Sequence, residues 1–421
     1  MIGTVAPERF MGWRMVAISF VVLNCALGIS VTAYGSLIGA IQREFHTSLA
    51  LATGGLSMIT LSLGLLSPVV GGLVRRVSLK RMMICGVLLN AAGFALLTQV
   101  DQIGWLLAIY GLMIGPGFCL FSIIPCTTIV SNWFVQGRGR ALGLINMPIG
   151  NAVMPVVAAY GLDKFGLHFV FWGSAALLLL LVPLILRIVD RPELVAQQAR
   201  GAESELNPDS SMPPPLPAKA ILLSIPFLVI TLGVATLSGG GMMLVAHLVA
   251  LGTEHGLSLG MASLLLAAYG LAGIAGAPVY GWLADRIGVG HAFAVLAFAQ
   301  VLPWLSFIFV GNSMIELTII ALLIGMGMNA VIALFGTLVG EWLGQANVSL
   351  AMGLSLLLQI PFMFGAGPLA GAMHDATGNY TASIMLHIAS FITIGLLFAV
   401  YRPPTPGIQP QAGRRPKLRE A

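Results

Sequence analysis

A small set of polar side chains lies inside the long apolar runs of the sequence, where few groups are available to recognise a solute. Its members are amides and phenols together with one imidazole: Asn24, Tyr34, Asn146, Asn151, His247, Tyr269, Asn329 and Gln359. An amide without a partner in hydrocarbon is costly, so each must face another helix or a water-filled cavity. We expect some of them to bind substrate. The alternative for each is a hydrogen bond between helices, typically about 0.6–2 kcal/mol.

His247 is the candidate for an ionisable group on a transport path. It follows the run Gly239-Gly240-Gly241 within an apolar segment. Ionisable groups inside a membrane are functional candidates by default, and an imidazole changes charge near neutral pH. A charged His247 could attract a carboxylate and later return the proton, which makes it the proton-coupling candidate. The alternative is a neutral imidazole bonded to a neighbouring helix. His387 is also deep, but we expect a structural role for it in the last span.

Residue patterns for enzymatic chemistry are not found in the sequence. It holds no Gly-rich phosphate loop ending in Gly-Lys-Ser/Thr, no nucleophile–base set and no cluster with metal-ligand spacing. The four cysteines lie in apolar runs, where they behave as small hydrophobic side chains. We therefore expect no catalytic residue, no cofactor and no metal. The net charge of +5 is not gathered on one basic face, so nucleic acid is not an expected partner.

The composition indicates a membrane protein. Of 421 residues, 58% are hydrophobic and 8% are charged, whereas soluble proteins carry roughly 25% charged residues. A helix needs about 20 apolar residues to cross the hydrocarbon core of a bilayer. This length divides the chain into twelve candidate spans, at roughly 13–39, 49–73, 81–99, 105–131, 140–160, 167–187, 221–250, 258–284, 291–310, 314–340, 349–372 and 381–401. We expect an all-α membrane protein of twelve transmembrane helices in the lipid bilayer.

The two halves of the chain repeat each other. Residues 67–76 are echoed by residues 277–286, an offset of 277 − 67 = 210, and both segments contain Pro-Val-x-Gly. Several such matches in register indicate two related halves. A charged, Pro-rich segment between them has the composition of a flexible linker. The sequence therefore predicts a six-helix bundle over 1–190, a cytoplasmic linker over 191–218, a second six-helix bundle over 219–401 and a cytoplasmic tail over 402–421.

The basic residues are distributed unequally between the two sides of the membrane. All but Arg43 and Lys164 of the 20 Lys and Arg residues fall on the side that an even number of spans gives to both termini and the linker. Loops rich in Lys and Arg stay in the cytoplasm, so this side is predicted to be cytoplasmic. We expect a multi-pass protein of the bacterial inner (plasma) membrane, present as a monomer.

A loop motif in the second half points to a family. Residues 281–288 read Gly-Trp-Leu-Ala-Asp-Arg-Ile-Gly and fit the pattern Gly-x-Leu-x-Asp-Arg-x-Gly. The motif resembles the cytoplasmic-loop motif of the major facilitator superfamily, and with the six-plus-six repeat the resemblance covers about residues 13–401. It implies two pseudo-symmetric bundles around a cavity that opens alternately to either side. It also implies a conformational switch formed by Gly281, Asp285 and Arg286. Arg75 and Arg76 form the first-half copy of this switch motif, but Arg75 stands where the carboxylate is expected, so Asp285 is expected to act alone.

A closer resemblance comes from shorter fragments. Gly12-Trp13 opens the first span, Asn132-Trp133-Phe134 precedes Arg138-Gly139-Arg140, and His247-Leu248-Val249 precedes Gly256-Leu257-Ser258. In this order they resemble the monocarboxylate-transporter group and the related oxalate/formate antiporters. That group implies small carboxylate substrates and often proton coupling. Its charged substrate-site residues, a Lys in the first span or an Arg in the eighth, have no counterpart inside these spans.

The sequence thus favours a secondary active transporter that moves a small organic solute by alternating access. A carboxylate is the leading substrate class and a proton is the candidate coupling ion. One alternative is an exporter of neutral hydrophobic compounds. Another, from a different class, is a non-transporting membrane sensor or scaffold, which the short linker and tail disfavour because neither could hold a signalling domain.

Overall fold

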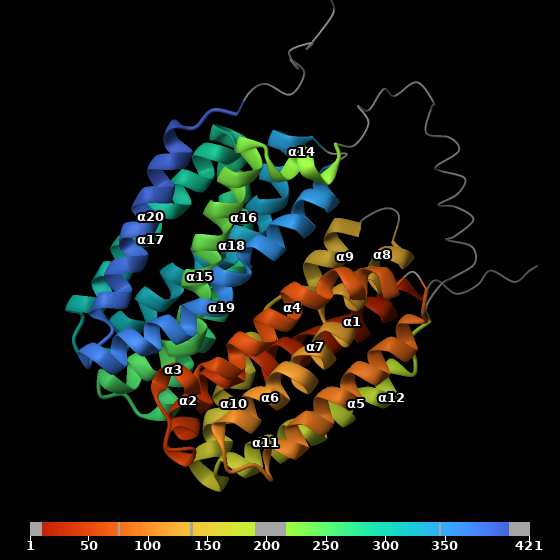
Figure 1. The fold of residues 1–421 in the computed structure, drawn as a ribbon, viewed down its shortest axis with the longest axis vertical. Helices are drawn as coiled ribbons and strands as arrows, with labels where there is room; N and C mark the ends of the chain where they lie inside the picture. Colours follow the sequence, from red (N-terminus) through yellow and green to blue (C-terminus); the bar gives the residue numbers. More distant parts are fainter. Residues whose placement is uncertain (1–10, 75, 135–137, 190–215, 345–346, 404–421) are drawn as a thin grey trace, which may run out of the picture.

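The computed structural model describes residues 11–74, 76–134, 138–189, 216–344 and 347–403, and every regular element in these ranges is a helix. Eleven helical stretches are long and apolar enough to cross a membrane. The apolar helix Gly54–Ser67 lies within α4 (Gly54–Leu73), where the second span was predicted. The predicted all-α membrane fold with twelve transmembrane helices in two bundles is therefore confirmed (Figure 1).

The first half forms one bundle. Its elements are α1 (Gly12–Leu27), the π-helix η1 (Gly28–Thr32), α2 (Ala33–Glu44), α3 (Leu49–Ala52), α4, α5 (Leu79–Leu97), α6 (Ile103–Ile109), the π-helix η2 (Tyr110–Ile114), α7 (Gly115–Phe121), α8 (Ile123–Trp133), α9 (Arg138–Ile145), α10 (Ile149–Phe165), α11 (Leu167–Leu179) and α12 (Leu181–Ile185). The first span runs without a break from α1 through α2.

The second half forms the other bundle from longer helices. Its elements are α14 (Ala218–Leu222), α15 (Ile225–Glu254), α16 (Leu259–Ile287), α17 (Val289–Phe309), α18 (Met314–Leu343), α19 (Val348–Thr377) and α20 (Thr381–Val400). Residues 191–215 of the predicted linker lie outside the described residues, and 216–218 lead into α14. The boundaries predicted for the two halves, the linker and the tail remain predictions.

Local sequence accounts for where many helices begin and end. The hydroxyl groups of Ser48, Ser258 and Ser313 each accept the backbone N–H of the residue three positions later. Such caps satisfy one of the N–H groups that a helix leaves free at its start. α19 ends at Thr377, and the φ of 76° at its C-cap Gly378 lies in the left-handed region that glycine adopts readily.

The fifth span is interrupted, although the sequence predicted one helix over 140–160. α9 ends at Ile145 and α10 begins at Ile149, and Pro148 between them has non-helical dihedral angles of φ −83° and ψ 46°. Proline has no backbone N–H and therefore cannot continue the hydrogen-bond ladder of the preceding helix. α9 has eight residues and therefore rises about 12 Å before the break. The N-terminus of α10 thus lies well inside the span.

The two bundles contact each other most closely at the end of the molecule opposite Met11 and Pro403, which we call the distal end. It carries the loops at 45–48, 255–258 and 378–380. In Figure 1 the bundles meet where α2 and α3 lie beside α15 and α19, and they diverge toward α9 and α14. Among the described residues, every hydrogen bond between the bundles lies at mid-depth or toward the distal end.

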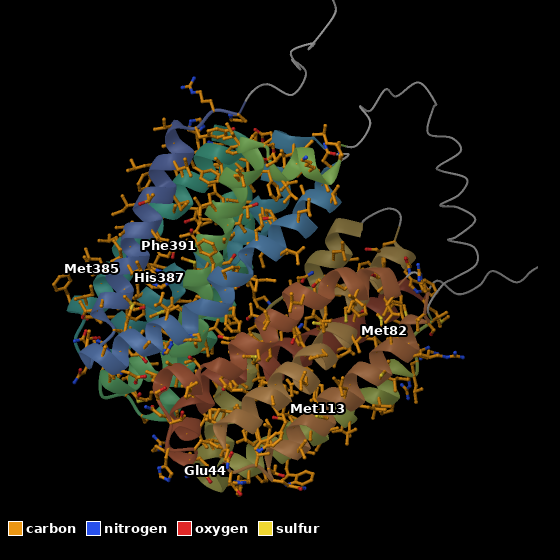
Figure 2. The ribbon with its side chains drawn as sticks, viewed as in Figure 1. Glu44, Met82, Met113, Met385, His387 and Phe391 are labelled. Atoms are coloured by element: carbon orange, nitrogen blue, oxygen red, sulfur yellow. The ribbon has the colours of Figure 1, made fainter. Side chains whose placement is uncertain are left out.

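α17 and α20 form the side of the second bundle that is remote from the first. Figure 2 shows His387 and Phe391 on α20 at this outer side. The His387 ring stacks on Trp304 of α17 with centroids 5.0 Å apart, and its Nδ1–H donates to the Ser383 carbonyl oxygen at 2.8 Å. These contacts agree with the structural role expected for His387.

Candidate functional site

Three of the residues predicted to bind substrate meet midway along the interface between the bundles. Asn151 on α10, Tyr269 on α16 and Asn329 on α18 form what we call the polar cluster. A Cβ atom at Gly270 would lie 3.2 Å from Asn151 Cβ, so α16 and α10 approach closely here. Asn329 Nδ2 donates to the Tyr269 carbonyl oxygen at 3.4 Å. α10 of the first half therefore packs closely against α16 of the second half beside these three residues.

Asn151 is the member of the polar cluster with unused hydrogen-bonding capacity. Its Oδ1 atom is buried without a hydrogen-bond partner in the described part of the chain. Asn329 instead donates to the Gly325 carbonyl oxygen at 2.8 Å, and the Tyr269 hydroxyl donates to the Gly241 carbonyl oxygen at 3.5 Å. A buried polar atom without a partner destabilises the fold, so such an atom calls for an explanation.

Asn24 holds the start of α10 rather than facing a path. Its Oδ1 accepts the Gly150 backbone N–H at 2.7 Å, and its Nδ2 donates to the Phe20 carbonyl oxygen at 3.0 Å. Gly150 is the second residue of α10, whose N-cap Pro148 provides no side-chain cap. A residue of α1 therefore caps a helix that has no cap of its own. Asn24 thereby positions the turn that carries Asn151.

Replacing Asn24 with Ala should lower the melting temperature of the protein. The Gly150 N–H would lose its partner in a buried environment, which costs roughly 1–3 kcal/mol. Asn146→Ala is the matched control, because the exposed Asn146 amide donates only to the Leu142 carbonyl oxygen in its own helical turn. Thermal unfolding in detergent would compare the two variants. Equal melting temperatures for them would show that Asn24 does not cap α10.

The other predicted amide and phenol groups lie away from the polar cluster. Tyr34 is 1% exposed, and its hydroxyl donates to the Ala52 carbonyl oxygen at 2.6 Å near the distal end. Gln359 is buried inside the second bundle and donates to Ser355 Oγ at 2.9 Å. Asn146 is exposed at the break between α9 and α10. The Tyr34 bond joins two helices, as its interhelical alternative predicts. The Gln359 bond stays within α19.

His247 is fully buried inside the second bundle. Its Nε2 lies 2.9 Å from the Gly367 carbonyl oxygen, so this nitrogen carries the proton and donates. Its Nδ1 lies 2.9 Å from the Tyr380 hydroxyl and accepts from it. Both ring nitrogens of a neutral imidazole are therefore satisfied, which is the geometry of the packing alternative.

A chain of polar side chains nevertheless connects His247 to the distal surface. The Tyr380 ring packs on the His374 ring with centroids 4.6 Å apart. His374 Nε2 lies 2.7 Å from a carboxylate oxygen of Glu254, whose side chain is 40% exposed. From the surface inward, Glu254 contacts His374, the His374 ring packs on the Tyr380 ring, and the Tyr380 hydroxyl donates to His247. The sequence did not reveal this series of groups.

The contacts that close the distal end were also missed by the sequence. We call them the distal gate, formed by Ser36, Leu49, Ala50, Ser57, Ser263, Phe364, Gly371 and Asp375. The two carboxylate oxygens of Asp375 on α19 accept the backbone N–H groups of Leu49 and Ala50, each at 3.3 Å. A carboxylate is favourable at this position because it faces the first N–H groups of α3. The sequence does show Asp375 as a lone carboxylate shortly before Gly378. It could not show the partner, because Ala50 lies 325 residues away in the chain.

Hydroxyl groups and glycine complete the distal gate. Ser57 donates to the Phe364 carbonyl oxygen at 2.6 Å, and Ser36 Oγ lies 3.2 Å from Ser263 Oγ. A Cβ atom at Gly371 would lie 2.7 Å from the Ala50 nitrogen, closer than a side chain tolerates. Small residues permit such approach of backbones where no hydrophobic force drives helices together.

The predicted switch motif lies at the opposite end and makes few contacts. Asp285 is exposed and forms no hydrogen bond or ion pair with another described residue. The Arg286 guanidinium lies 4.3 Å from the centroid of the Trp282 ring. A Cβ atom at Gly281 would meet nothing within 4 Å. Arg76 is exposed, and Arg75 lies outside the described residues. The Asp285 latch stays a prediction, and it would act in a state closed at this end.

Asp285→Asn is expected to slow transport while leaving expression and substrate affinity nearly unchanged. The substitution removes a charge remote from the polar cluster, so it alters the balance between the two open states rather than the site. Uptake into proteoliposomes would provide both the rate and the affinity. A wild-type rate in the variant would contradict the latch.

Comparison with known proteins places the chain among transporters. It is 24% identical over 391 residues to monocarboxylate transporter 13 of Rattus norvegicus, covering 91% of this chain and 87% of that protein. It is 28% identical over 413 residues to monocarboxylate transporter 11 of Homo sapiens, covering 93% of this chain and 84% of the relative.

Solved structures show the same fold. The nucleoside transporter NupG superposes with a TM-score of 0.71 at 14% identity, covering 92% of this chain and 99% of its own. A peptide transporter, POT, superposes with a TM-score of 0.70 at 15% identity, covering 94% and 95%. The family model of the Major Facilitator Superfamily matches residues 20–251 and 228–420. With this match over both halves and the two-bundle fold, the chain belongs to the Major Facilitator Superfamily.

Proposed function

We propose that this transporter is a secondary active carrier that moves a small organic solute, with a carboxylate as the leading substrate class, by alternating access. Its relatives are transporters and not enzymes. The supporting observation is the one-sided contact between the bundles, with the polar cluster at mid-depth and the distal gate beyond it. We expect a solute to approach the polar cluster from the end opposite the distal gate, where the bundles diverge.

Two features of the site support a small acid as the solute. The Asn151 amide offers an oxygen that accepts and a nitrogen that donates, so it could pair with both oxygens of a protonated carboxylic acid. Asn151 also lies in the first turn of α10, and the N-terminal end of a helix favours negative charge. Relatives named monocarboxylate transporters point in the same direction.

A neutral solute is the second candidate. The polar cluster contains two amides and a phenol and no charged side chain. An amide that serves a protonated acid would serve a neutral amide or alcohol equally well. Export of neutral compounds therefore fits the same geometry, and the ligand screen below separates the two.

The ligand screen measures thermal unfolding of the purified carrier against small carboxylates and their neutral amide and alcohol analogues. A ligand that binds only the folded protein stabilises it by about 2.7 kcal/mol at a concentration 100 times its dissociation constant. We expect carboxylates to raise the melting temperature more than their analogues. A shift from the neutral analogues alone would replace the carboxylate proposal with the neutral one.

We further propose that His247 couples transport to protons. Two hydrogen-bonded pairs, Glu254–His374 and Tyr380–His247, lie between the distal surface and His247 and meet in the ring contact of His374 with Tyr380. A proton would have to cross this ring contact to reach His247. Gly367, whose carbonyl oxygen bonds His247, also lies at the interface, because a Cβ atom there would be 3.4 Å from Thr53 Cβ. Protonation of Nδ1 would end its acceptance of the Tyr380 hydroxyl and so disturb a contact beside the distal gate.

His247→Gln should abolish the pH dependence of uptake. Gln keeps a hydrogen-bonding side chain but does not titrate near neutrality, whereas imidazole does. Wild-type uptake is expected to vary between about pH 5 and 8, and the variant is expected to give a flat profile. Tyr380→Phe tests the proposed route, because it removes the hydroxyl that faces Nδ1. Curves of the same shape for wild type and His247→Gln would leave His247 as a packing residue.

The membrane orientation is proposed on the distribution of Lys and Arg. Among the Lys and Arg residues that the structure describes, only Arg43 and Lys164 lie on the distal side. By the positive-inside rule, both termini then lie in the cytoplasm, which for a bacterial host means the inner membrane. The distal gate would accordingly face the exterior. We also propose that the carrier works as a monomer.

A further inference from the structure

Two grooves lie at the distal end, one in each half of the molecule. The first, between the end of α5 and the start of α6, has a volume of about 490 Å3. The second, between the end of α17 and the start of α18, has a volume of about 470 Å3. Positions related by the 210-residue offset line both grooves: Leu96 and Ser306, Gln99 and Phe309, Val100 and Val310, Ile109 and Ile319, and Met113 and Leu323. The groove is therefore a repeated feature of the fold rather than an isolated depression.

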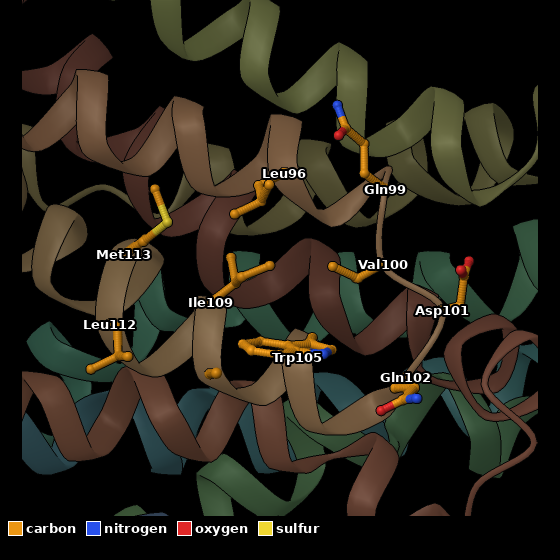
Figure 3. A pocket seen from close by; sticks show the side chains of 10 residues that line it. Leu96, Gln99, Val100, Asp101, Gln102, Trp105, Ile109, Leu112 and Met113 are labelled. Atoms are coloured by element: carbon orange, nitrogen blue, oxygen red, sulfur yellow. The ribbon is translucent and has the colours of Figure 1, made fainter.

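The first groove changes from polar to apolar along its length. Figure 3 shows Asp101 and Gln102 at one end, Trp105 in the middle, and Leu112 and Met113 at the other end. Trp105 is 62% exposed, although it is the largest apolar side chain in the groove. Tryptophan is enriched where the headgroup region of a bilayer meets its hydrocarbon. Asp101 and Gln102 therefore lie at the level of the lipid headgroups.

The length of the groove matches one leaflet of the membrane. Ten residues separate the start of α6 at Ile103 from Met113, which corresponds to a rise of about 15 Å. The hydrocarbon core of a bilayer is about 30 Å thick, so the groove reaches its middle. An acyl chain from the distal leaflet would fill the apolar part while its headgroup stayed beside Asp101.

Each groove carries one carboxylate near its polar end. Asp101 and Glu316 are both exposed, and neither forms an ion pair within the described residues. The exposed Asp163 at the same end differs, because Lys164 Nζ lies 3.1 Å from its carboxylate. A primary ammonium group offers three N–H donors to a carboxylate and a strong charge-assisted bond. A quaternary ammonium group has no N–H to offer.

We propose that each groove binds one phospholipid of the distal leaflet whose headgroup ends in a primary ammonium, as in phosphatidylethanolamine. One acyl chain lies along the groove, and the ammonium group bonds to Asp101 in the first groove or to Glu316 in the second. The two lipids would support the ends of α5–α6 and α17–α18 on the outer surface of the two bundles, away from the polar cluster.

The test is native mass spectrometry of the full-length carrier in detergent with phosphatidylethanolamine, phosphatidylcholine or phosphatidylglycerol of the same acyl chains. We expect wild type to retain up to two phosphatidylethanolamine molecules and several-fold less of the other lipids. Asp101→Asn and Glu316→Gln should each remove one, and the double variant should remove both. Ala108→Phe, which fills the first groove, should also remove one. Asp163→Asn is the control and should behave as wild type.

Two results would overturn the proposal. One is equal retention of phosphatidylethanolamine and phosphatidylcholine, and the other is unchanged retention in the double variant. Excess soluble phosphoethanolamine should not displace the lipid, because it lacks the acyl chain. Displacement by this compound would show a headgroup site without a groove-bound chain and would contradict the proposal as well.

Discussion

Asp375→Asn is expected to weaken the distal gate and to shift the carrier toward the state that is open at the distal end. Asn replaces one of the two carboxylate oxygens by an NH2 group that only donates, so one of the N–H groups of Leu49 and Ala50 loses its acceptor and the charge is lost. Asp375 is exposed, so we expect the loss of its charge at the start of α3 to destabilise the closed distal gate by about 1 kcal/mol. That value corresponds to a roughly fivefold change in the ratio of the two states.

The shift would be measured as a distance distribution between spin labels at Leu51→Cys on α3 and Ala372→Cys on α19. Both positions are exposed at the distal end. The longer distance should gain population in Asp375→Asn, whereas Asp285→Asn should favour the shorter one. Asp163→Asn is the matched control, because this distal carboxylate pairs within its own bundle with Lys164. A distribution in Asp375→Asn that matched the control would contradict a gating role for Asp375.

Asn151→Leu is expected to raise the KM for transport of a protonated carboxylic acid roughly 5- to 100-fold, because two hydrogen bonds of about 0.5–1.5 kcal/mol each would be lost. The variant keeps a side chain of similar size but removes the amide whose Oδ1 is unpaired. The distal gate would remain intact, since Asn151 contributes no contact to it. Uptake kinetics in proteoliposomes would be measured with the solute that the thermal screen selects.

Asn146→Leu provides the control for Asn151→Leu. Both amides belong to the fifth span, but the exposed Asn146 bonds within its own turn of helix. Its loss should leave KM within about twofold of wild type, since exposed substitutions change stability by roughly 0.5 kcal/mol or less. An equal rise of KM in the two variants, or no rise in Asn151→Leu, would remove Asn151 from the site.

The sequence predicts the features of this carrier that arise from local pattern. Long apolar runs gave the number of spans, because crossing a bilayer imposes a minimum length on each helix. The 210-residue repeat identified two halves, and the loop at 281–288 indicated the family. Position within the spans also suggested Asn151, Tyr269 and Asn329, which the structure brings together.

The remaining features depend on contacts between distant parts of the chain. Asn24 has the same chemistry as Asn151, but it caps α10 because α1 packs beside Gly150, 126 residues away. Asp375 looks like an ordinary loop carboxylate until α3 is placed against the end of α19. His247 has two bonded nitrogens only because α19 and Tyr380 surround it. Polarity in the sequence thus marks where hydrogen bonds form, whereas packing decides whether a solute or another helix forms them.

The central claim is that the distal gate and the opposite end open in alternation around the polar cluster. The direct measurement is pulsed spin-label spectroscopy on the full-length carrier in liposomes, with Cys25, Cys85, Cys119 and Cys126 replaced. One label pair spans the distal gate at Leu51→Cys and Ala372→Cys, and the other spans the opposite end at Gly72→Cys and Gly281→Cys, where added side chains meet nothing within 4 Å. Each pair should show two distances. Asp375→Asn should increase the population of the longer distance at the distal gate and of the shorter distance at the opposite end. A single fixed distance for each pair in wild type and variant would contradict alternating access.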